Sequence, residues 1–339
     1  MNPPPRPKVL MALYHLGQRA VPYMQRLERE GFEVVPNPVG RRPTEEEMVR
    51  ILPGVFATIA GIEPYTERVF QAALDLKIVA RYGVGYDMVD VAAATRHGVA
   101  VAMAFGTNHE AVADSAFTLM AAIVGNVVPA HLEVKRGGWG TDLHPGLWRA
   151  TVGIVGLGRI GKAVARRCRG FEMRILAYDA VPDVAFAREN GISLVPLDTL
   201  LREADIVTLH APHTPETENL INRERLALMK PGAYLVNSAR GGLVNEEALY
   251  EALTSGRLAG AGLDVFRNEP PVGSPLLGLR NVVMSPHNAG SNATSEAAGV
   301  HRCIDSIVAL ASGKGPEPEY LLNPEVLLTE RGGMPRPLA

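Results

Sequence analysis

Three residues able to bind anions or move protons follow apolar runs in the second half of the sequence. Arg240 comes after AYLVN, Glu269 follows GAGLDVF, and His287 comes after NVVMSP. A guanidinium has a planar fork that suits a carboxylate, and an imidazole can give and take a proton near neutral pH. A carboxylate hydrogen-bonded to the imidazole would fix its orientation and favour its protonated form. Hydride transfer to a 2-keto acid requires this combination of groups.

Each of these residues also has an ordinary structural explanation when it is taken singly. Arg240 could form a surface ion pair, Glu269 could be a solvated loop charge, and His287 could cap its strand. Their shared position favours function, because in an open α/β sheet ligands bind outside the carboxyl ends of the strands. Asp264, at the end of AGAGLD, is a fourth polar residue in such a position.

A glycine-rich turn between an apolar strand and a helix predicts a dinucleotide site. Gly156, Gly158 and Gly161 in TVGIVGLGRIGKAVARR have G-x-G-x-x-G spacing. They permit a tight turn, a close approach of the backbone to a pyrophosphate, and packing of helix on strand, respectively. Asp179 ends the next strand, where it can accept hydrogen bonds from the adenosine ribose and would repel a 2′-phosphate. We therefore expect NAD rather than NADP.

Apolar runs alternate with helical patterns throughout the chain. The first half contains KVLMAL, FEVVPN and KIVARYG, and the second contains ATVGIVG, RILAYDA, DIVTLHA and GAYLVNSA. This alternation predicts α/β architecture with two doubly wound parallel sheets, each covered by helices on both faces. A long apolar segment, residues 116–130, is interrupted at Gly125, Asn126 and Pro129. We expect it to be a helix in a core or a subunit interface.

Length and composition limit the classes of protein. The chain has 339 residues, enough for two domains, and its formal net charge of −2 provides no basic field for nucleic acid. Two cysteines are too few for a disulfide framework. Prolines occupy the N-terminus where a signal peptide would be apolar, and the longest apolar segment is too short to span a membrane. We expect a cytoplasmic protein with neither nucleic-acid nor membrane partners.

An ordered set of motifs resembles the NAD-dependent D-2-hydroxyacid dehydrogenase family, which includes D-3-phosphoglycerate dehydrogenase. The resemblance covers about residues 8–328, and its motifs are RYGVGYDMVD, GTNHEAVAD, GLGRIG, LHAPHTPETENLIN, NSARGGLVNEEAL, GAGLDVFRNEPP and SPHNAG. It implies that Arg240, Glu269 and His287 are the catalytic triad, with His287 as the general acid-base. It also implies an oxidoreductase that transfers a hydride between NAD(H) and a small D-2-hydroxy or 2-keto acid.

The resemblance further implies how the domains are arranged. A flavodoxin-like substrate domain would consist of residues 1–104 and 291–339, and a Rossmann NAD-binding domain, residues 105–290, would be inserted into it. Family members usually pair through the apolar helix after Asn108, so the resemblance implies a homodimer. Asp114 stands where many relatives have Glu, a shortening that we do not expect to affect the chemistry.

Ligand contacts can be assigned residue by residue from the motifs and the resemblance. Asp264 is implied to hold the nicotinamide carboxamide, and the backbone amides of Gly83, Val84 and Gly85 the substrate carboxylate. The predicted substrate residues are Arg81, Gly83, Val84, Gly85, Arg240 and His287. The predicted cofactor residues are Gly156, Gly158, Arg159, Ile160, Gly161, Asp179, His210, Pro212, Ser238, Ala239, Arg240, Asp264, His287 and Gly290. No metal is expected.

The identity of the substrate is open at this stage. Phosphoglycerate-type relatives often carry an Arg-Ser pair where this chain has Ala60-Gly61, so one potential phosphate-binding arginine is absent. Arg81 matches a position that relatives use for a phosphate or other polar tail, although an ion pair at the edge of the core explains it equally well. We expect a short polar tail, with 3-phosphoglycerate one candidate beside compounds like hydroxypyruvate and glyoxylate.

Two other interpretations are less favoured. His210 and His213 could form a metal pair, but no cysteine or paired carboxylates accompany them, and loop contacts near the adenosine fit better. An NAD-sensing, corepressor-like binding protein of the same superfamily would retain the same residues, but the chain lacks long disordered arms for interaction. Turnover of 2-keto acids with NADH would discriminate between enzyme and sensor.

Overall fold

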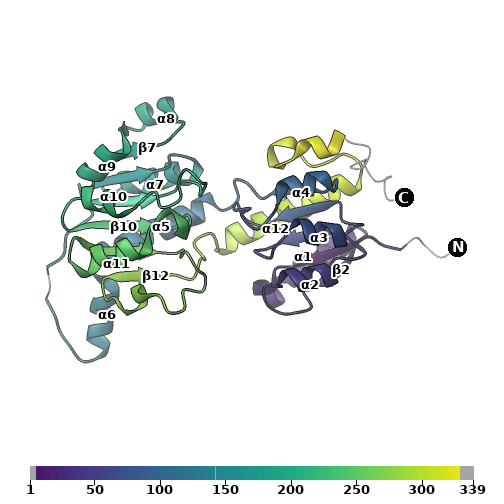
Figure 1. The fold of residues 1–339 in the computed structure, drawn as a ribbon, viewed down its shortest axis with the longest axis horizontal. Helices are drawn as coiled ribbons and strands as arrows, with labels where there is room; N and C mark the ends of the chain where they lie inside the picture. The colour runs from purple at the N-terminus through teal and green to yellow at the C-terminus, as the bar shows by residue number, and fades with distance from the viewer. Residues whose placement is uncertain (1–4, 142, 329–339) are drawn as a thin grey trace. The chain divides into compact units, whose positions relative to one another are not determined.

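The computed structural model describes residues 5–141 and 143–328, and the chain forms two compact units. One unit comprises Met1–Asn108 and Asn292–Ala339, and the other comprises His109–Ser291. The boundaries predicted from sequence were at residues 104/105 and 290/291. Each unit is an α/β layer structure of its own (Figure 1).

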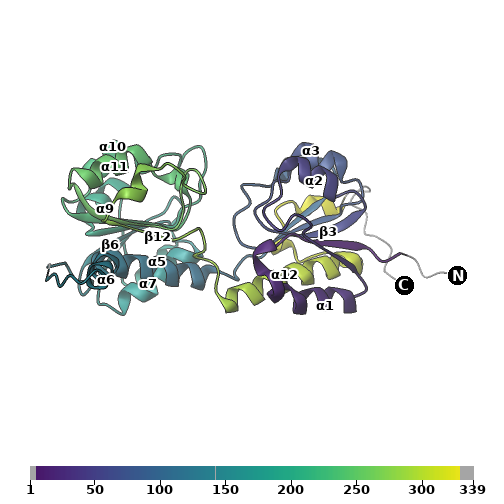
Figure 2. The same cartoon turned by 90° about the horizontal axis from the view of Figure 1, so that it is seen from below.

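The first unit contains a five-stranded parallel sheet in the order β2-β1-β3-β4-β5. Its strands are β1 (Lys8–Met11), β2 (Glu33–Pro36), β3 (Val55–Ala60), β4 (Ile78–Arg81) and β5 (Ala100–Met103). Its helices are α1 (Val21–Arg29), α2 (Glu45–Ile51), α3 (Glu67–Ala72), α4 (Val91–Arg96) and α12 (Ala293–Ala311). Helices α2 and α3 lie on one face of the sheet, and α1 and α12 on the other (Figure 2). The strand order is that of flavodoxin-like sheets.

The second unit contains a seven-stranded parallel sheet in the order β12-β11-β10-β9-β6-β7-β8. Its strands are β6 (Thr151–Val155), β7 (Arg174–Tyr178), β8 (Ser193–Leu194), β9 (Ile206–Leu209), β10 (Ala233–Asn237), β11 (Leu258–Leu263) and β12 (Val282–Met284). Its helices are α5 (His109–Val124), α6 (Val127–Lys135), α7 (Arg159–Arg169), α8 (Val184–Glu189), α9 (Leu197–Glu203), α10 (Arg223–Leu228) and α11 (Glu246–Thr254). The order reverses between β6 and β9, as in a Rossmann fold. The predicted fold class is confirmed.

Burial on both faces explains why the strands were visible as apolar runs. Every residue of β6, β9 and β10 is buried. One hydrophobic cluster packs α9, α10 and α11 on one face of the seven-stranded sheet, and another packs α5 and α7 on the opposite face (Figure 2). In the first unit, separate clusters likewise fill the two faces of the sheet.

The long apolar segment forms two helices instead of one. Helix α5 ends at Val124, Asn126 adopts a positive φ of 49°, and α6 begins at Val127 at an angle of 61° to α5. The break falls at the Gly125-Asn126 interruption noted in the sequence. Within the described residues no single helix is long and apolar enough to cross a membrane; the bent pair α5 and α6 passes that test only jointly, by length and composition. Eight of the 16 residues of α5 are buried.

Candidate active site

The glycine turn lies between β6 and α7, as the sequence predicted. Gly156 has a φ of +93°, and a Cβ there would lie 2.6 Å from the carbonyl carbon of His210, so both conformation and space require glycine. A Cβ on Gly161 would collide with the carbonyl oxygen of Gly156, and Gly158 opens onto free space. Arg159 and Ile160 begin α7, whose N-cap, Gly158, has no capping side chain. The first amides of α7 can therefore bind an anion such as a pyrophosphate.

Asp179 lies directly beside this turn. Its carboxylate accepts hydrogen bonds from the backbone N–H of Leu157 at 2.6 Å and of Val181 at 2.8 Å. These two bonds fix the carboxylate at the carboxyl end of β7, next to the strand that carries the glycine turn. A negative charge held there suits a ribose diol and disfavours a 2′-phosphate.

Polar atoms without protein partners line the same edge of the sheet. Among the described residues, the Ser238 hydroxyl after β10 and Nδ1 of His210 after β9 are buried without a hydrogen-bond partner. Nε2 of His210 lies 2.9 Å from the Thr208 hydroxyl, and burial lowers the pKa of His210 to about 3, so the ring is neutral. Unpaired buried polar atoms are costly in a protein alone. Together with the open glycine turn and Asp179, they fit a dinucleotide.

Glu269 and His287 meet at the carboxyl ends of β11 and β12. Nδ1 of His287 lies 2.6 Å from Oε2 of Glu269, and the backbone N–H of Phe266 donates to Oε1 at 3.0 Å. Partial burial opposes ionisation of Glu269, but the bonds to His287 and Phe266, with the nearby charge of Arg240, hold its pKa below the usual value. Both side chains remain accessible, at 42% and 34% exposure for His287 and Glu269. The arrangement therefore supplies an ionised carboxylate that orients an accessible imidazole.

Arg240 is held at the neighbouring strand end by its backbone. The buried side chain of Asn237 donates to the Arg240 carbonyl at 2.9 Å and accepts from the N–H of Ala239 at 3.1 Å. Nη1 of Arg240 donates to the Ala239 carbonyl at 2.7 Å. The residue is partly exposed, so its charge acts on Glu269 from the edge of the sheet.

Asp264 organises the loop that carries His287. His287 has a φ of +49°, a left-handed conformation that costs a non-glycine residue about 1 kcal/mol. The Asp264 carbonyl accepts from the His287 N–H at 2.8 Å, and its buried carboxylate accepts from the Ser285 hydroxyl at 2.6 Å and from the N–H groups of Asn288 and Ala289, both at 3.0 Å. These bonds stabilise the unusual turn. The sequence indicated a ligand role for Asp264 and missed this structural one.

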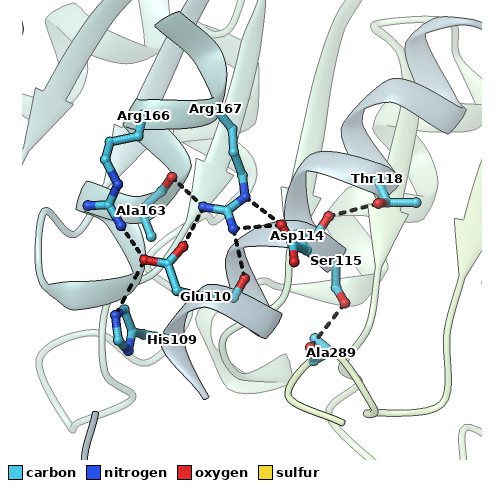
Figure 3. A network of polar contacts seen from close by, with 9 residues as sticks. All are labelled: His109, Glu110, Asp114, Ser115, Thr118, Ala163, Arg166, Arg167 and Ala289. Carbon is cyan, nitrogen blue, oxygen red and sulfur yellow. Dashed lines mark hydrogen bonds and ion pairs between the residues drawn. The ribbon is translucent and has the colours of Figure 1, made fainter. Parts of the chain in front are cut away.

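Helix α5 supports the same loop from outside the sheet (Figure 3). The Ser115 hydroxyl donates to the Ala289 carbonyl at 3.0 Å, two residues after His287. The guanidinium of Arg167 on α7 bonds to the Asp114 carboxylate at 2.6 Å and to the Glu110 carboxylate at 2.9 Å. These ion pairs hold α5 against α7. Arg166 also pairs with Glu110. The shortened Asp114 thus still reaches a partner, and nothing in the sequence indicated this network.

The remaining predicted site residues fall into two groups. Pro212 is exposed after β9, and Ala239 and Gly290 adjoin Arg240 and His287 in the second unit. The predicted substrate residues Arg81, Gly83, Val84 and Gly85 belong to the first unit, where Arg81 ends β4. Gly83 has a φ of +98°, and a Cβ there would lie 3.2 Å from Nη1 of Arg81.

A metal centre has no support among the residues that the structure describes. His213 pairs with Glu218, and His210 bonds to Thr208, so the two histidines have separate partners. No group of three potential ligands that could hold a metal ion occurs in residues 5–141 and 143–328.

Comparisons with known proteins show which family this chain is similar to. The profile of the family described as "D-isomer specific 2-hydroxyacid dehydrogenase, NAD binding domain" matches residues 117–289. A glyoxylate reductase from Korarchaeum cryptofilum is 44% identical over 272 residues, 78% of this chain and 81% of its own length. A D-3-phosphoglycerate dehydrogenase from Archaeoglobus fulgidus is 40% identical over 90% of this chain, which spans 58% of that protein. The structure of D-lactate dehydrogenase from Aquifex aeolicus with NAD and lactic acid has a TM-score of 0.80 and 28% identity, covering 91% of this chain and 96% of that one.

Proposed function

We propose residue roles and a substrate class for this chain from the premise that it belongs to the D-isomer specific 2-hydroxyacid dehydrogenase family. As a member of that family it is an NAD-dependent oxidoreductase acting on CH–OH groups. The reaction converts a D-2-hydroxy acid and NAD⁺ into a 2-keto acid, NADH and a proton. This enzymatic role is favoured over an NAD-sensing binding protein, because the similar proteins are named as reductases and dehydrogenases.

In the proposed mechanism His287 is the acid-base group. NAD, when bound, supplies or accepts the hydride. During reduction the imidazolium of His287 donates its proton to the oxygen of the substrate carbonyl, and during oxidation the neutral imidazole removes the hydroxyl proton. Glu269 orients the ring and favours its protonated form, and Arg240 binds the substrate carboxylate and keto oxygen. The observation that carries this proposal is the 2.6 Å contact between Glu269 and His287 at the edge of a dinucleotide-binding sheet.

Cofactor contacts are proposed for the same edge of the second unit. The turn from Gly156 to Gly161 would hold the pyrophosphate, and Asp179 the adenosine ribose. Ser238 and His210 would contact the cofactor through polar atoms that lack protein partners. Asp264 would contact the nicotinamide carboxamide in addition to holding the His287 loop. The other contacts assigned from sequence are Arg159, Ile160, Pro212, Ala239, Arg240, His287 and Gly290.

The first unit is proposed to bind the substrate. Backbone amides of Gly83, Val84 and Gly85 would bind the carboxylate, and Arg81 would face the tail. The candidate substrates are glyoxylate, hydroxypyruvate and the phosphorylated analogue of hydroxypyruvate. If Arg81 contacts the tail, Arg81→Ala should raise KM for the best polar-tailed substrate and change KM for glyoxylate little. Equal losses with both would assign Arg81 a structural role instead.

A substrate panel tests the proposed function directly. Purified full-length protein is mixed with NADH or NADPH and each 2-keto acid, and the absorbance of the reduced cofactor is followed. We expect turnover with NADH and a clear preference over NADPH. Tight NADH binding without turnover of any 2-keto acid would instead support the sensor.

A homodimer is proposed from the surface of α6 and the loop after it. This helix buries none of its residues, and large apolar side chains lie exposed along the segment. They are Val127, Val128, Leu132, Val134, Trp139, Leu143 and Trp148. An accumulation of exposed apolar side chains along one segment is typical of an interface. Light scattering after gel filtration should give twice the chain mass, and Trp139→Glu should weaken the dimer.

A cytoplasmic location is proposed from cysteine usage. Cys168 and Cys303 are both buried free thiols, and burial raises the pKa of each to about 12. Two inert thiols without a disulfide suit a reducing compartment. Fractionation of cells expressing the untagged protein tests this proposal.

A further inference from the structure

A buried carboxylate occupies the carboxyl end of β3 in the first unit. Glu63 is 1% exposed. Its carboxylate accepts hydrogen bonds from the Gly61 N–H at 2.9 and 3.1 Å and from the Tyr65 hydroxyl at 3.0 Å. The Tyr65 oxygen in turn lies 2.9 Å from the Thr58 hydroxyl. Glu63 is therefore fixed in position, and neither the proposed mechanism nor the cofactor site uses it.

The position of Glu63 in the fold is one where ligands are expected. In the order β2-β1-β3-β4-β5 the chain leaves in opposite directions from β1 and β3, so the switch point of this sheet lies between them. Ligands of open α/β sheets bind at such a point, outside the carboxyl ends of the strands. The Gly61 N–H, a donor at the end of β3, is already occupied by the carboxylate of Glu63.

Arg81 ends the neighbouring strand beside this carboxylate. Ala60 of β3 pairs in register with Arg81 of β4, and the N–H of Tyr82 donates to the Ala60 carbonyl at 2.9 Å. Gly61 and Arg81 therefore occupy adjacent strand ends. Burial raises the pKa of Glu63, and the charge of Arg81 opposes that rise, so the two groups interact electrostatically.

The packing around Gly61 links Glu63 to the absent Arg-Ser pair. A Cβ on Gly61 would lie 2.9 Å from Oε2 of Glu63 and 3.3 Å from Cδ2 of Leu13. The first distance is too short for a Cβ contact, and the carboxylate is held by several hydrogen bonds. A larger residue at position 61 and the inward carboxylate of Glu63 therefore exclude each other in this arrangement.

We propose that Glu63 is a specificity-determining residue whose carboxylate occupies the anion position at the end of β3 and offsets the charge of Arg81. The enzyme would then favour 2-keto acids with a short uncharged tail over those with a phosphate. The carboxylate of Glu63 would repel a phosphate, because both are negatively charged. The Gly61 N–H could not bind the phosphate either, because it already donates to Glu63. This inference rests on the proposed function and specifies its substrate class.

Glu63→Gln tests the proposal, because it removes the charge and nearly preserves the shape. Steady-state kinetics with NADH are measured for glyoxylate, hydroxypyruvate and 3-phosphohydroxypyruvate. We expect the ratio of kcat/KM for the phosphorylated to the unphosphorylated compound to rise about tenfold or more, mainly through KM, while glyoxylate changes little. Glu47→Gln is the matched control: Glu47 also pairs with an arginine and accepts a backbone N–H, at the cap of α2, and its loss should leave the ratio unchanged.

The outcomes separate this inference from the proposed function. An unchanged ratio in a Glu63→Gln protein that still reduces glyoxylate overturns the role of Glu63 alone. A wild-type preference for the phosphorylated compound also overturns it. If wild type binds NADH but reduces none of the three compounds, the proposed function is wrong, and the inference about Glu63 is wrong as well. Should Glu63→Gln not fold, Gly61→Ala provides the second test, because its Cβ would displace the carboxylate; a rise in the same ratio supports the proposal, and no rise contradicts it.

Discussion

The carboxyl edges of the two sheets place a glutamate in opposite environments. In the second unit Glu269 is about one-third exposed and bonds to an imidazole that is also accessible. In the first unit Glu63 is 1% exposed and bonds to a backbone N–H and a tyrosine hydroxyl. The exposed carboxylate bonds to an imidazole that a substrate can reach, whereas the buried carboxylate bonds only to groups of its own unit. In our proposals the same architecture thus provides acid-base chemistry at one edge and selectivity at the other.

The largest expected effect is loss of the imidazole from the accessible edge. His287→Ala should lower kcat by roughly 10²–10⁴-fold, because proton transfer loses its positioned group. The affinity for NADH, measured by fluorescence titration, should survive. His97→Ala is the control, since His97 also bonds to a glutamate, Glu67, at 2.7 Å, but lies in the first unit. Near-normal turnover by His287→Ala would remove this pair from the mechanism.

The next effect concerns cofactor choice at the edge of the second unit. Asp179→Ala removes the ribose acceptor and the repulsion of a 2′-phosphate, so the preference for NADH over NADPH should fall by about tenfold or more. The substitution also removes the acceptor for Leu157 and Val181, so both KM values should rise. The ratio of kcat/KM for NADH to kcat/KM for NADPH reports recognition of the ribose, because the lost hydrogen bonds to Leu157 and Val181 affect both cofactors alike. Asp198→Ala, on helix α9, should leave the ratio unchanged, and wild-type use of NADPH as efficient as NADH would contradict the assignment.

A smaller effect is expected from removing only the charge of Glu269. Glu269 stays ionised to lower pH than an ordinary glutamate, so a negative charge lies beside the imidazole of His287. Glu269→Gln should move the pH–rate inflections of both directions toward acid, because it removes the negative neighbour of the imidazole. Reduction then loses rate at a lower pH, and oxidation keeps its rate to a lower pH. Glu67→Gln should move neither inflection, and unmoved inflections in Glu269→Gln would mean that the carboxylate does not act through His287.

Most of the fold was predictable because buried parallel strands are apolar on both faces. The strands β6, β7, β9 and β10 each fall within a run identified from sequence. Helix α3 is shorter than the apolar spacing of TERVFQAALDL indicates: it ends at Ala72, because Ala73 leaves the helical region with a ψ of 61°. Strand β5, AVAM, was not identified from sequence although it lies within the apolar run VAVAMAF, because alanine is depleted in strands.

The candidate site was predictable only where a residue follows a strand. Glu269 and His287 were visible on that rule, and the structure places them in contact. The hydrogen-bonding role of Asp264 was not, because its partners Ser285, Asn288 and Ala289 lie 21 to 25 residues away in sequence. Glu63 was missed for a different reason. A glutamate in a loop is normally solvated, and its burial depends on Tyr65, Thr58 and the absent side chain of Gly61.

The smallest expected effect is on stability, and its sign should differ between the two edges. Burial lowers the pKa of His210 from 6.5 to about 3, so between those values the unfolded chain binds a proton that the folded chain does not. The unfolding free energy of the second unit should therefore fall with acid, by at most about 1.4 kcal/mol per pH unit. Burial raises the pKa of Glu63 above 4.5, so ionisation on folding is disfavoured. The unfolding free energy of the first unit should therefore fall as the pH rises through the raised pKa.

Two variants with uncharged side chains test these opposite pH dependences of the unfolding free energy. Relative to wild type, His210→Gln should be more stable at pH 5 than at pH 7, because it removes a group that must stay neutral in the fold while the unfolded chain protonates. Glu63→Gln should show the reverse, being relatively more stable at pH 7, because burial opposes the ionisation of Glu63 in the folded wild type and glutamine has no proton to lose. Thermal unfolding without NAD at both pH values measures each difference, since bound cofactor would itself stabilise the fold. Trends of the same sign in both variants would mean that the charge on Arg81 fully offsets the burial of Glu63, and that the two edges differ less than their exposures indicate.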